Sequence, residues 1–485
     1  ARMSSRPALP AGLRLDAHKT APLQHPLRAA LAPQVAVLAL DQGSGEAAEP
    51  TVAVGTRVRI GTPIARAVGH AATDLHSPVA GVVVEVATRA TVAGVGRCIL
   101  IESDATDARD PALVPVDWRA LDGVTLLDRL RSAGIAGLGG AAFPAAGKLT
   151  LARASAAAHL LLNGAECEPW ICCDDALMRE RAADVVLGGQ VMLAACGATR
   201  CTIAIEDDKP EAAAAIAAAI AAAQDDRVEL VELPAIYPLG AERQLIEAVT
   251  GREVPHDTLP PAVGVVCQNV GTAAAVARFV TTGEPVVSRI VTVTGRGVAC
   301  PGNLEVRIGT PIAELVAACG GYQGDPARLI VGGAMTGRSL SSDLVPTTKG
   351  VNCIVAATLA DLASRDPEMP CIRCGDCAAA CPARLLPQQL HRAAQVDDRD
   401  ALARLGLADC IECGCCDYVC PSQIPLTARF HAARQRLQLQ DAERQRAAEA
   451  RGRFERHERR LAEQAEAERL AFEAARRRAR GAGPT

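Results

Sequence analysis

Residues 371–382 of the chain, CIRCGDCAAACP, contain four cysteines separated by two, two and three residues and followed by proline. Residues 410–421, CIECGCCDYVCP, repeat the pattern. This spacing is typical of proteins that bind two [4Fe–4S] clusters, where the fourth cysteine of each run ligates the other cluster. The sequence therefore predicts two crossed ligand sets. They are Cys371, Cys374, Cys377 and Cys420 for the first cluster, and Cys381, Cys410, Cys413 and Cys416 for the second.

Structural zinc is the main alternative for these runs. Zinc sites usually present paired C-x2-C arms separated by a longer loop, whereas here four cysteines stand in one tight run, twice. Cys415 does not fit the repeat, and we expect a small buried thiol there. The ten cysteines from Cys98 to Cys353 show no ligand spacing. Among them, the group Cys167, Cys172 and Cys173 is a candidate for a further redox site.

Length and composition restrict the possible functions. At 485 residues the chain should hold about three to five folding units. Aromatic residues make up only 2%, which argues against a nucleic-acid surface built on base stacking, and the formal charge of -4 gives no general attraction to phosphate backbones or anionic lipid. No stretch reaches the ~18 apolar residues of a membrane span, and no secretory signal is evident at the N-terminus. We expect a cytosolic multidomain α/β protein.

The N-terminal part predicts a small β domain. After an N-terminal extension at 1–29, residues 30–110 contain short β-rich runs separated by glycines, such as TVAVGTRVRIGTPIA at 51–65. These runs resemble a lipoyl-type barrel sandwich. Carrier domains of that type attach their prosthetic group to a lysine at a hairpin tip, and no lysine stands between Gly69 and Pro78. A structural or docking role is therefore expected.

The rest of the chain divides by its patterns. Residues 111–286 alternate apolar runs with helical patterns, which predicts a Rossmann-like α/β domain with a mostly parallel sheet. Residues 287–345 resemble a β-grasp module of the soluble-ligand-binding type, and 346–367 are expected to be a linker. The cluster domain occupies 368–425. In 426–485 opposite charges often stand three or four residues apart, which predicts a charged helix, either a solvated tail or a docking segment.

Two segments of the α/β domain predict a ligand pocket. Residues 137–148, GLGGAAFPAAGK, contain glycines that let backbone N–H groups approach a phosphate, with a lysine at the end. This segment matches neither the G-x-G-x-x-G nor the Walker pattern. Residues 163–170, NGAECEPW, follow a strand-like run and put an amide and two carboxylates at a strand's carboxyl end, where ligands bind in such sheets. Taken singly, the segments near Tyr237 and Asn269 could each be a simple turn or helix cap and not part of a ligand site.

Together these features resemble the C subunit of the Rnf (also called Rsx) ion-translocating electron transport complex. The α/β domain is similar to the NADH-binding flavoprotein subunit of respiratory complex I, which implies FMN as cofactor and NADH as substrate. The resemblance carries over no catalytic acid or base. It implies that the flavin and nucleotide residues are Gly137, Gly139, Gly140 and Lys148 in the pocket wall, Asn163, Glu166 and Glu168 near the ring, Asn269 and Thr272 near the ribityl phosphate, and Phe143 beside the dinucleotide.

The resemblance also implies partners and a location. Electrons would pass between NAD(H) and ferredoxin or flavodoxin through FMN and the clusters, coupled to ion movement by membrane subunits, one of them an iron–sulfur subunit. The chain would lie peripherally on the cytoplasmic side of a bacterial inner membrane. Leu138 replaces an arginine and Ala142 a glycine of the complex I pattern, and residues 239–241 also differ from Rnf relatives. Two alternatives are a stand-alone reductase similar to cobalamin reductases and a cluster scaffold with a degenerate flavin site.

Overall fold

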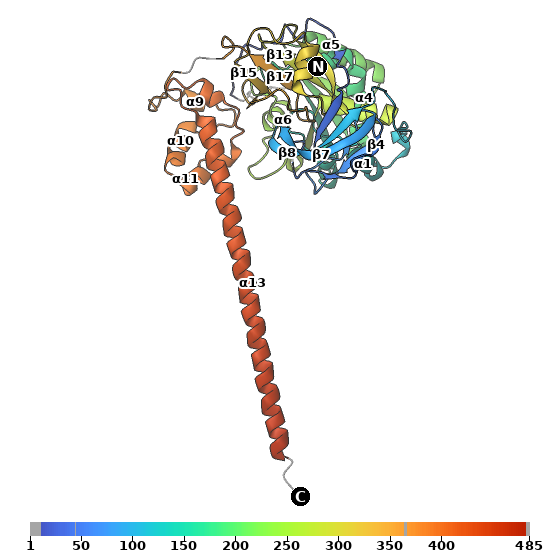
Figure 1. Ribbon diagram of the computed structural model, residues 1–485. Helices are drawn as coiled ribbons and strands as arrows, with labels where there is room; N and C mark the ends of the chain where they lie inside the picture. Colours follow the sequence, from blue (N-terminus) through green and yellow to red (C-terminus); the bar gives the residue numbers. More distant parts are fainter. Residues whose placement is uncertain (1–10, 44, 363–365, 482–485) are drawn as a thin grey trace.

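The computed structural model describes residues 11–43, 45–362 and 366–481, so the first ten residues of the predicted extension, part of the predicted linker and the last four residues lie outside it. A globular body contains the barrel sandwich, the α/β domain and the β-grasp module (Figure 1). The cluster domain lies beside this body, and one long helix projects from it. The predicted multidomain α/β class is confirmed.

The barrel sandwich consists of two small antiparallel sheets. One sheet has the order β2-β8-β7-β4 and the other β3-β5-β6. Ile64 from one sheet and Ile99 from the other are fully buried in the shared core, which explains the alternation of apolar and polar residues along these short strands. The strands are β2 (Val35–Ala39), β3 (Glu49–Pro50), β4 (Arg57–Val58), β5 (Pro63–Arg66), β6 (Leu75–His76), β7 (Gly81–Thr91) and β8 (Gly94–Ser103).

The α/β domain has a four-stranded parallel sheet in the order β11-β10-β9-β12. Its strands are β9 (His159–Gly164), β10 (Arg200–Glu206), β11 (Val228–Leu233) and β12 (Val265–Asn269). Its helices are α1 (Gly123–Ser132), α2 (Ala145–Ala154), α3 (Cys173–Glu180), α4 (Ala182–Cys196), α5 (Pro210–Ala223), α6 (Glu242–Thr250) and α7 (Val270–Thr282), with 3-10 turns η1 (Trp118–Ala120) and η2 (Pro260–Val263). Asn163 and Asn269 pair in register at the carboxyl ends of β9 and β12, which brings the two polar segments together.

The β-grasp module is larger than the sequence predicted. Its sheet has the order β1-β14-β13-β17-β15-β16, and α8 (Ile312–Ala318) accompanies it. The strands are β1 (Arg28–Ala29), β13 (Ser288–Thr294), β14 (Gly302–Arg307), β15 (Arg328–Val331), β16 (Arg338–Leu340) and β17 (Cys353–Ala357). Strand β17 falls inside the predicted linker at 346–367, yet it lies between β13 and β15 and is entirely buried. The linker prediction was wrong there because a five-residue apolar run carries no periodic signal of its own.

The cluster domain also extends past its predicted end at residue 425. Its elements are α9 (Asp376–Ala379), α10 (Pro387–Gln395), α11 (Arg399–Arg404), η3 (Leu407–Asp409), α12 (Cys415–Tyr418) and the start of α13 (Leu426–Gly481). Leu426, Phe430 and Ala433 from the first turns of α13 are buried in this domain's core. The predicted charged helix is therefore partly a core element.

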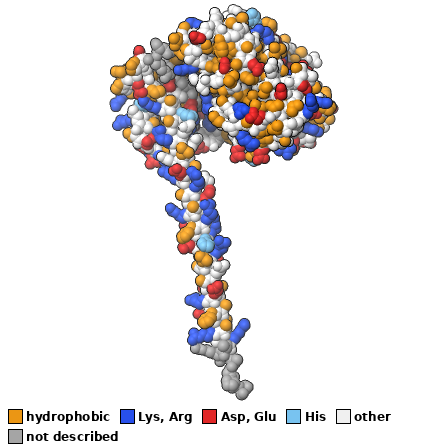
Figure 2. Space-filling model, in the orientation of Figure 1, with side chains coloured by type: hydrophobic (Ala, Val, Ile, Leu, Met, Phe, Trp, Pro, Cys, Tyr) orange, Lys and Arg blue, Asp and Glu red, His pale blue; other side chains and the backbone are white. Residues whose placement is uncertain are grey.

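The remainder of α13 is exposed to solvent. On the side seen in Figure 2, both basic and acidic side chains lie along this helix, in agreement with the close spacing of opposite charges in the sequence. None of the helices in the described part of the chain is both long and apolar enough to cross a lipid bilayer.

Helices α4 and α7 pack closely because α4 carries glycine at the crossing. A methyl group added at Gly188 would overlap the backbone carbonyl of Ala273 in α7. At the adjacent Gly189, the nearest atoms to such a methyl group are side-chain atoms of Leu162 and Cys201, at 3.2 and 3.3 Å. Gly188 is therefore the position that sets the distance between these helices.

Replacing Gly188 with alanine should destabilise the α/β domain by roughly 1–3 kcal/mol, because the added methyl group would push the backbone of α7 away. This cost should exceed the ~1 kcal/mol by which alanine stabilises a helix relative to glycine. Calorimetric unfolding of the full chain would show this domain melting several degrees lower. Gly189→Ala is the matched control, with a shift near zero because flexible side chains can move. Equal shifts in both variants would contradict this account of the packing.

Candidate functional site

The cluster domain contains two small cavities, each of about 20 Å³. Each cavity is lined by cysteines from both runs. The first is lined by Cys371, Cys374, Cys377 and Cys420, and the second by Cys381, Cys410, Cys413, Cys415 and Cys416. Cysteine thiolates are the ligands of [4Fe–4S] clusters, so the donors around both cavities suit such a cluster.

The two cysteine loops have matching backbone geometry. Gly375 and Gly414 both have positive φ values, +93° and +78°, at the start of α9 and α12. Arg373 and Glu412, two residues earlier in each loop, also lie in the left-handed region. This local symmetry explains why the loops can wrap similar groups.

The surroundings of the two cluster sites differ. Cys371 and Cys374 are exposed, whereas the second site, which includes Cys413, adjoins the globular body. Cys415 is fully buried and packs with Tyr237 and Ala380, in agreement with its predicted space-filling role.

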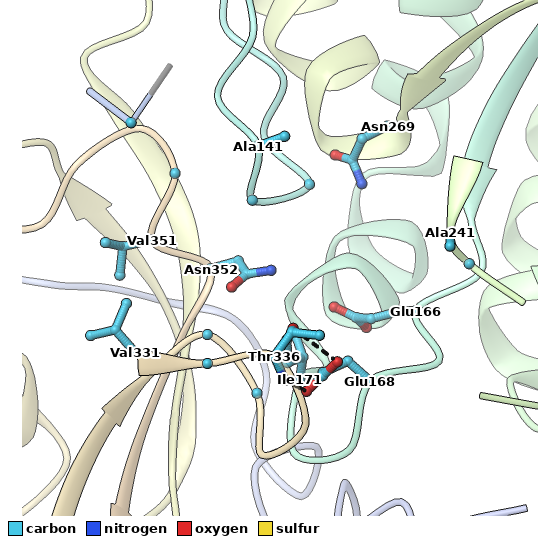
Figure 3. Close-up of a pocket in the computed structure, with 18 of the residues that line it drawn as sticks. Ala141, Glu166, Glu168, Ile171, Ala241, Asn269, Val331, Thr336, Val351 and Asn352 are labelled. Atoms are coloured by element: carbon cyan, nitrogen blue, oxygen red, sulfur yellow. Dashed lines mark hydrogen bonds between the residues drawn. The ribbon is translucent and has the colours of Figure 1, made fainter. Parts of the chain in front are cut away.

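A cavity of about 590 Å³, which we call the main cavity, lies where the body and the cluster domain meet. The α/β domain forms one wall with Ala141 and Asn269, and the β-grasp module forms the facing wall with Val331 and Asn352 (Figure 3). The barrel sandwich contributes residues 41–43, and the cluster domain contributes Ile411 and Cys413. All four units of the chain therefore meet at one cavity.

Six of the ten predicted flavin and nucleotide residues line the main cavity: Gly139, Gly140, Asn163, Glu166, Glu168 and Asn269. Gly137, Phe143, Lys148 and Thr272 lie behind its wall. Lys148 donates from Nζ to Glu242 at 2.8 Å, and the hydroxyl of Thr272 accepts the backbone N–H of Leu138 at 2.9 Å. Thr272 thus supports the glycine-rich loop, whereas Lys148 joins α2 to α6.

The glycine-rich loop presents unpaired backbone donors to the cavity. Within the described chain, the N–H groups of Gly139, Gly140 and Ala141 have no acceptor, and all three residues are exposed. Consecutive free N–H groups suit an anionic or ring-carbonyl ligand, so the loop fits FMN. Ala142 has φ of +52°, which explains why glycine occupies this position in the complex I pattern. Leu138 is buried behind the loop and not exposed to the cavity.

The asparagines fix the carboxyl end of the sheet. The side-chain oxygen of Asn269 accepts the N–H groups of Gly271 and Thr272 and caps α7. Its Nδ2 donates to Asp174 at 2.6 Å, while Nδ2 of Asn163 donates to the carbonyl of Gly240 at 2.7 Å. Both asparagines therefore hold the cavity floor in place.

Glu166 is a buried carboxylate at the beginning of α3. It accepts the N–H of Asp174 at 3.0 Å and that of Asp175 at 3.2 Å, so the helix N-terminus stabilises its charge. Burial, followed by the charge of Glu166, raises the pKa of Asp174 above its ordinary value. Oxygens of Glu166 and Asp174 and the sulfur of Cys173 lie within 4.8 Å of one another.

Glu168 connects the α/β domain to the β-grasp module. Its carboxylate accepts the N–H of Met335 at 2.6 Å, the N–H of Thr336 at 3.1 Å and the hydroxyl of Thr336 at 3.2 Å (Figure 3). A methyl group added at Gly333 would overlap this carboxylate. Burial raises the pKa of Glu168, and these hydrogen bonds lower it in part. Glu168 thus holds the 332–337 turn over the cavity.

The cavity residues that sequence reasoning missed come from the other units. They are Asp41 and Gln42 from the barrel sandwich, Thr336, Arg338, Thr348 and Asn352 from the β-grasp module, and Ile411 from the cluster domain. No motif joins these positions, since they stand up to several hundred residues apart. Only the tertiary arrangement of the units brings them together.

The surroundings of Cys167, Cys172 and Cys173 do not favour a further redox site. Burial raises the pKa of both Cys167 and Cys172 to about 12, and the pKa of Cys173 is raised as well, so their reactive thiolate forms are disfavoured. Cys167 lines the main cavity, and its sulfur accepts the N–H of Gly240 at 3.2 Å.

Tyr237 connects the main cavity with the second cluster site. Its hydroxyl donates to the carbonyl of Cys413 at 2.6 Å, and both residues line the cavity. The ring packs in a small apolar cluster that also contains Cys415 and Met335. A ligand in the main cavity would therefore lie directly beside the Cys413 loop.

Four family models match the chain in order. They are the RnfC barrel sandwich hybrid domain at residues 8–106, the Nuo51 FMN-binding domain at 130–278, the SLBB domain at 290–339 and the 4Fe-4S dicluster domain at 370–424. The expected FMN and [4Fe–4S] cofactors are thus confirmed at the level of domains.

Two relatives are each named as the C subunit of an ion-translocating oxidoreductase complex. The protein of Pseudomonas aeruginosa is 43% identical over 95% of this chain and 59% of its own length. That of Yersinia pestis bv. Antiqua is 40% identical over 90% of this chain and 70% of its own length. The chain spans only about three fifths of the length of several such relatives. A solved NAD+-reducing [NiFe]-hydrogenase aligns with a TM-score of 0.43 and 20% identity over 66% of this chain and 62% of that one.

If the ligand sets are crossed, the iron content of double cysteine variants depends on which two cysteines are replaced. Cys371→Ser with Cys420→Ser should remove one cluster and keep about four iron atoms per chain, because both residues belong to one site. Cys371→Ser with Cys381→Ser should damage both sites and leave less iron. Iron and sulfide analysis of anaerobically purified protein measures the difference, and Cys415→Ser is the control that keeps both clusters. If the Cys371→Ser, Cys420→Ser variant instead holds less iron than the Cys371→Ser, Cys381→Ser variant, each run binds its own cluster.

Proposed function

Because this chain belongs to the family formed by the C subunit of ion-translocating oxidoreductase complexes, we propose that it transfers electrons between NAD(H) and two [4Fe–4S] clusters through FMN. FMN bound to the chain would supply the conversion between hydride, which carries two electrons, and the single electrons that clusters accept. The family membership and the matched FMN-binding and dicluster domains support this proposal.

The observation that carries the proposal is the continuity of the main cavity. One space extends from the free N–H groups of the glycine-rich loop to Cys413, which lines the second cluster site as well. A flavin held at the loop and a cluster held at Cys413 would be neighbours, as short-range electron transfer requires. Asn163 and Asn269 position the floor of this space, and Glu168 holds the 332–337 turn beside it.

The residues around the cavity act by binding and orientation. Glu166 is occupied by the α3 backbone, which suits a fixed negative charge near the ring better than a proton donor. Hydride transfer to a flavin requires no general acid, so no side chain is assigned that role. The free N–H groups at Gly139 to Ala141 would receive the flavin phosphate or a ring carbonyl.

The two clusters would have an order along the path. The site of Cys381, Cys410, Cys413 and Cys416 would exchange electrons with the flavin first. The site that includes the exposed Cys371 and Cys374 would be the outlet, because a partner can approach it closely.

The proposed partners follow from the family. Membrane subunits of the complex, one of them an iron–sulfur subunit, would exchange electrons with the outlet cluster and couple the flow to ion movement. Ferredoxin or flavodoxin would be the other terminal of the complex. The chain would be a peripheral subunit on the cytoplasmic side of a bacterial inner membrane.

Two alternatives make different predictions. A stand-alone reductase similar to cobalamin reductases would need no membrane partners, and the similarity to subunits of a complex argues against it. A cluster scaffold with a degenerate flavin site would contain full iron and bind no FMN. The free N–H groups and the open cavity favour a functional flavin site.

Anaerobically purified protein should contain about eight iron atoms and one FMN, and NADH should bleach flavin and cluster absorbance together. In the double variant Cys381→Ser with Cys413→Ser, NADH should still bleach the flavin but no longer reduce the outlet cluster rapidly, because the intermediate carrier is missing. Rapid-mixing absorbance and EPR spectroscopy measure both steps.

The variant Cys371→Ser with Cys420→Ser is the matched control, since it removes the outlet and should leave reduction of the other cluster unchanged. Equal behaviour of the two double variants would reject the proposed order. Full iron without flavin, even after FMN is supplied, would favour the scaffold.

A further inference from the structure

The main cavity has an unusual charge distribution for a site that receives phosphates. Among the described residues that line it, four are acidic, namely Asp41, Glu166, Glu168 and Asp174, and Arg338 is the single Lys or Arg. The lysine that the family resemblance implied, Lys148, lies behind the wall and is paired with Glu242. FMN and a nicotinamide dinucleotide both bring negative phosphate groups. The cavity therefore needs a cation, and, among these lining residues, only Arg338 is placed to provide it.

Arg338 is held at the edge of the cavity by rigid structure. It is the first residue of β16 and pairs in register with Val331 of β15. The intervening turn is fixed by Glu168, which accepts the N–H groups of Met335 and Thr336. The position of Arg338 is therefore fixed by a sheet and by the partly buried carboxylate of Glu168. Arg338 lies outside the matched FMN-binding domain, which ends at residue 278.

The guanidinium group of Arg338 has no structural role within the protein. It forms no hydrogen bond or ion pair with any residue that the structure describes, and the side chain is exposed. Arg289, a contrasting arginine of the same module, is buried and donates to the carbonyls of Leu138, Ile290 and Lys349. A free, exposed guanidinium at the rim of an acidic cavity is available for a ligand.

We propose that Arg338 binds the pyrophosphate of the nicotinamide dinucleotide, so that the β-grasp module forms half of the dinucleotide site. This inference rests on the proposed function and names the residue that recognises its substrate. A guanidinium matches two phosphate oxygens in a bidentate arrangement, which lysine cannot reproduce.

The two walls of the cavity would then serve different ligands. The glycine-rich loop lines the cavity from the α/β wall and would take the flavin. Arg338 belongs to the opposite wall, which also carries Val331 and Thr336 (Figure 3). The flavin remains bound through turnover, while the dinucleotide must enter and leave. An exposed cation at the rim suits the ligand that exchanges.

The test measures binding of ADP-ribose, which contains the pyrophosphate but no nicotinamide, to the FMN-loaded chain by calorimetry. Arg338→Gln should weaken ADP-ribose binding about 10- to 100-fold, since a charge-assisted contact is lost, and Arg338→Lys should recover only part of the affinity. The Arg338→Gln variant should also raise the NADH concentration for half-maximal flavin bleaching by a similar factor. FMN and iron contents should match those of the unchanged protein, which also verifies folding.

Arg328→Gln is the matched control, because Arg328 is also an exposed arginine of this sheet and does not line the cavity. Its ADP-ribose affinity should not change. If Arg338→Gln loses FMN and keeps ADP-ribose affinity, the arginine serves the flavin phosphate and the inference is overturned. Unchanged affinity for both ligands overturns it too. Failure of the unchanged, FMN-loaded chain to bind ADP-ribose and to react with NADH would instead reject the proposed function.

Discussion

One buried ammonium group holds the three units of the globular body together. Nζ of Lys349, which is 1% exposed, donates to the hydroxyl of Thr73 and the carbonyls of Asp74 and Gly134 at 2.7–3.2 Å. These acceptors belong to the barrel sandwich and the α/β domain, whereas Lys349 precedes β17 of the β-grasp module. Burial lowers the pKa of Lys349 to about 7, so the contacts must compensate a large desolvation cost. Its neighbours at 350–352 line the main cavity, whose shape therefore depends on this junction.

The parts of the molecule that could be predicted from the sequence are those specified by local spacing. Each cysteine run contains three ligands within seven residues, and the glycine-rich loop and the NGAECEP segment each carry their signal within a dozen residues. The facing wall could not be predicted. Thr336 and Asn352 become cavity residues only because β15 and β17 pair beside β13, and that pairing is decided by long-range packing. Strand β17 was missed for the same reason, since its five apolar residues suit a linker or a strand equally.

The carboxylates of the NGAECEP segment show how a motif can combine binding and assembly. Glu166 and Glu168 both line the main cavity, yet each is engaged by protein donors. Glu166 is held by the backbone at the start of α3, and Glu168 is held by the 332–337 turn. Their short spacing therefore orients the floor and the cover of the cavity relative to each other. The sequence predicted that these residues lie at the site but not that they join its two walls.

The unequal exposure of the cluster cysteines has a consequence for the durability of the protein in air. Thiolates at Cys371 and Cys374 face solvent, where dioxygen, peroxide and chelators reach them without any opening of the structure. The loop that contains Cys413 is shielded by Tyr237 and the globular body. Oxidative damage should therefore begin at the cluster held by these exposed cysteines, before it reaches the site beside the globular body. In the proposed electron path, loss of the exposed cluster would leave electrons on the other cluster without their next acceptor.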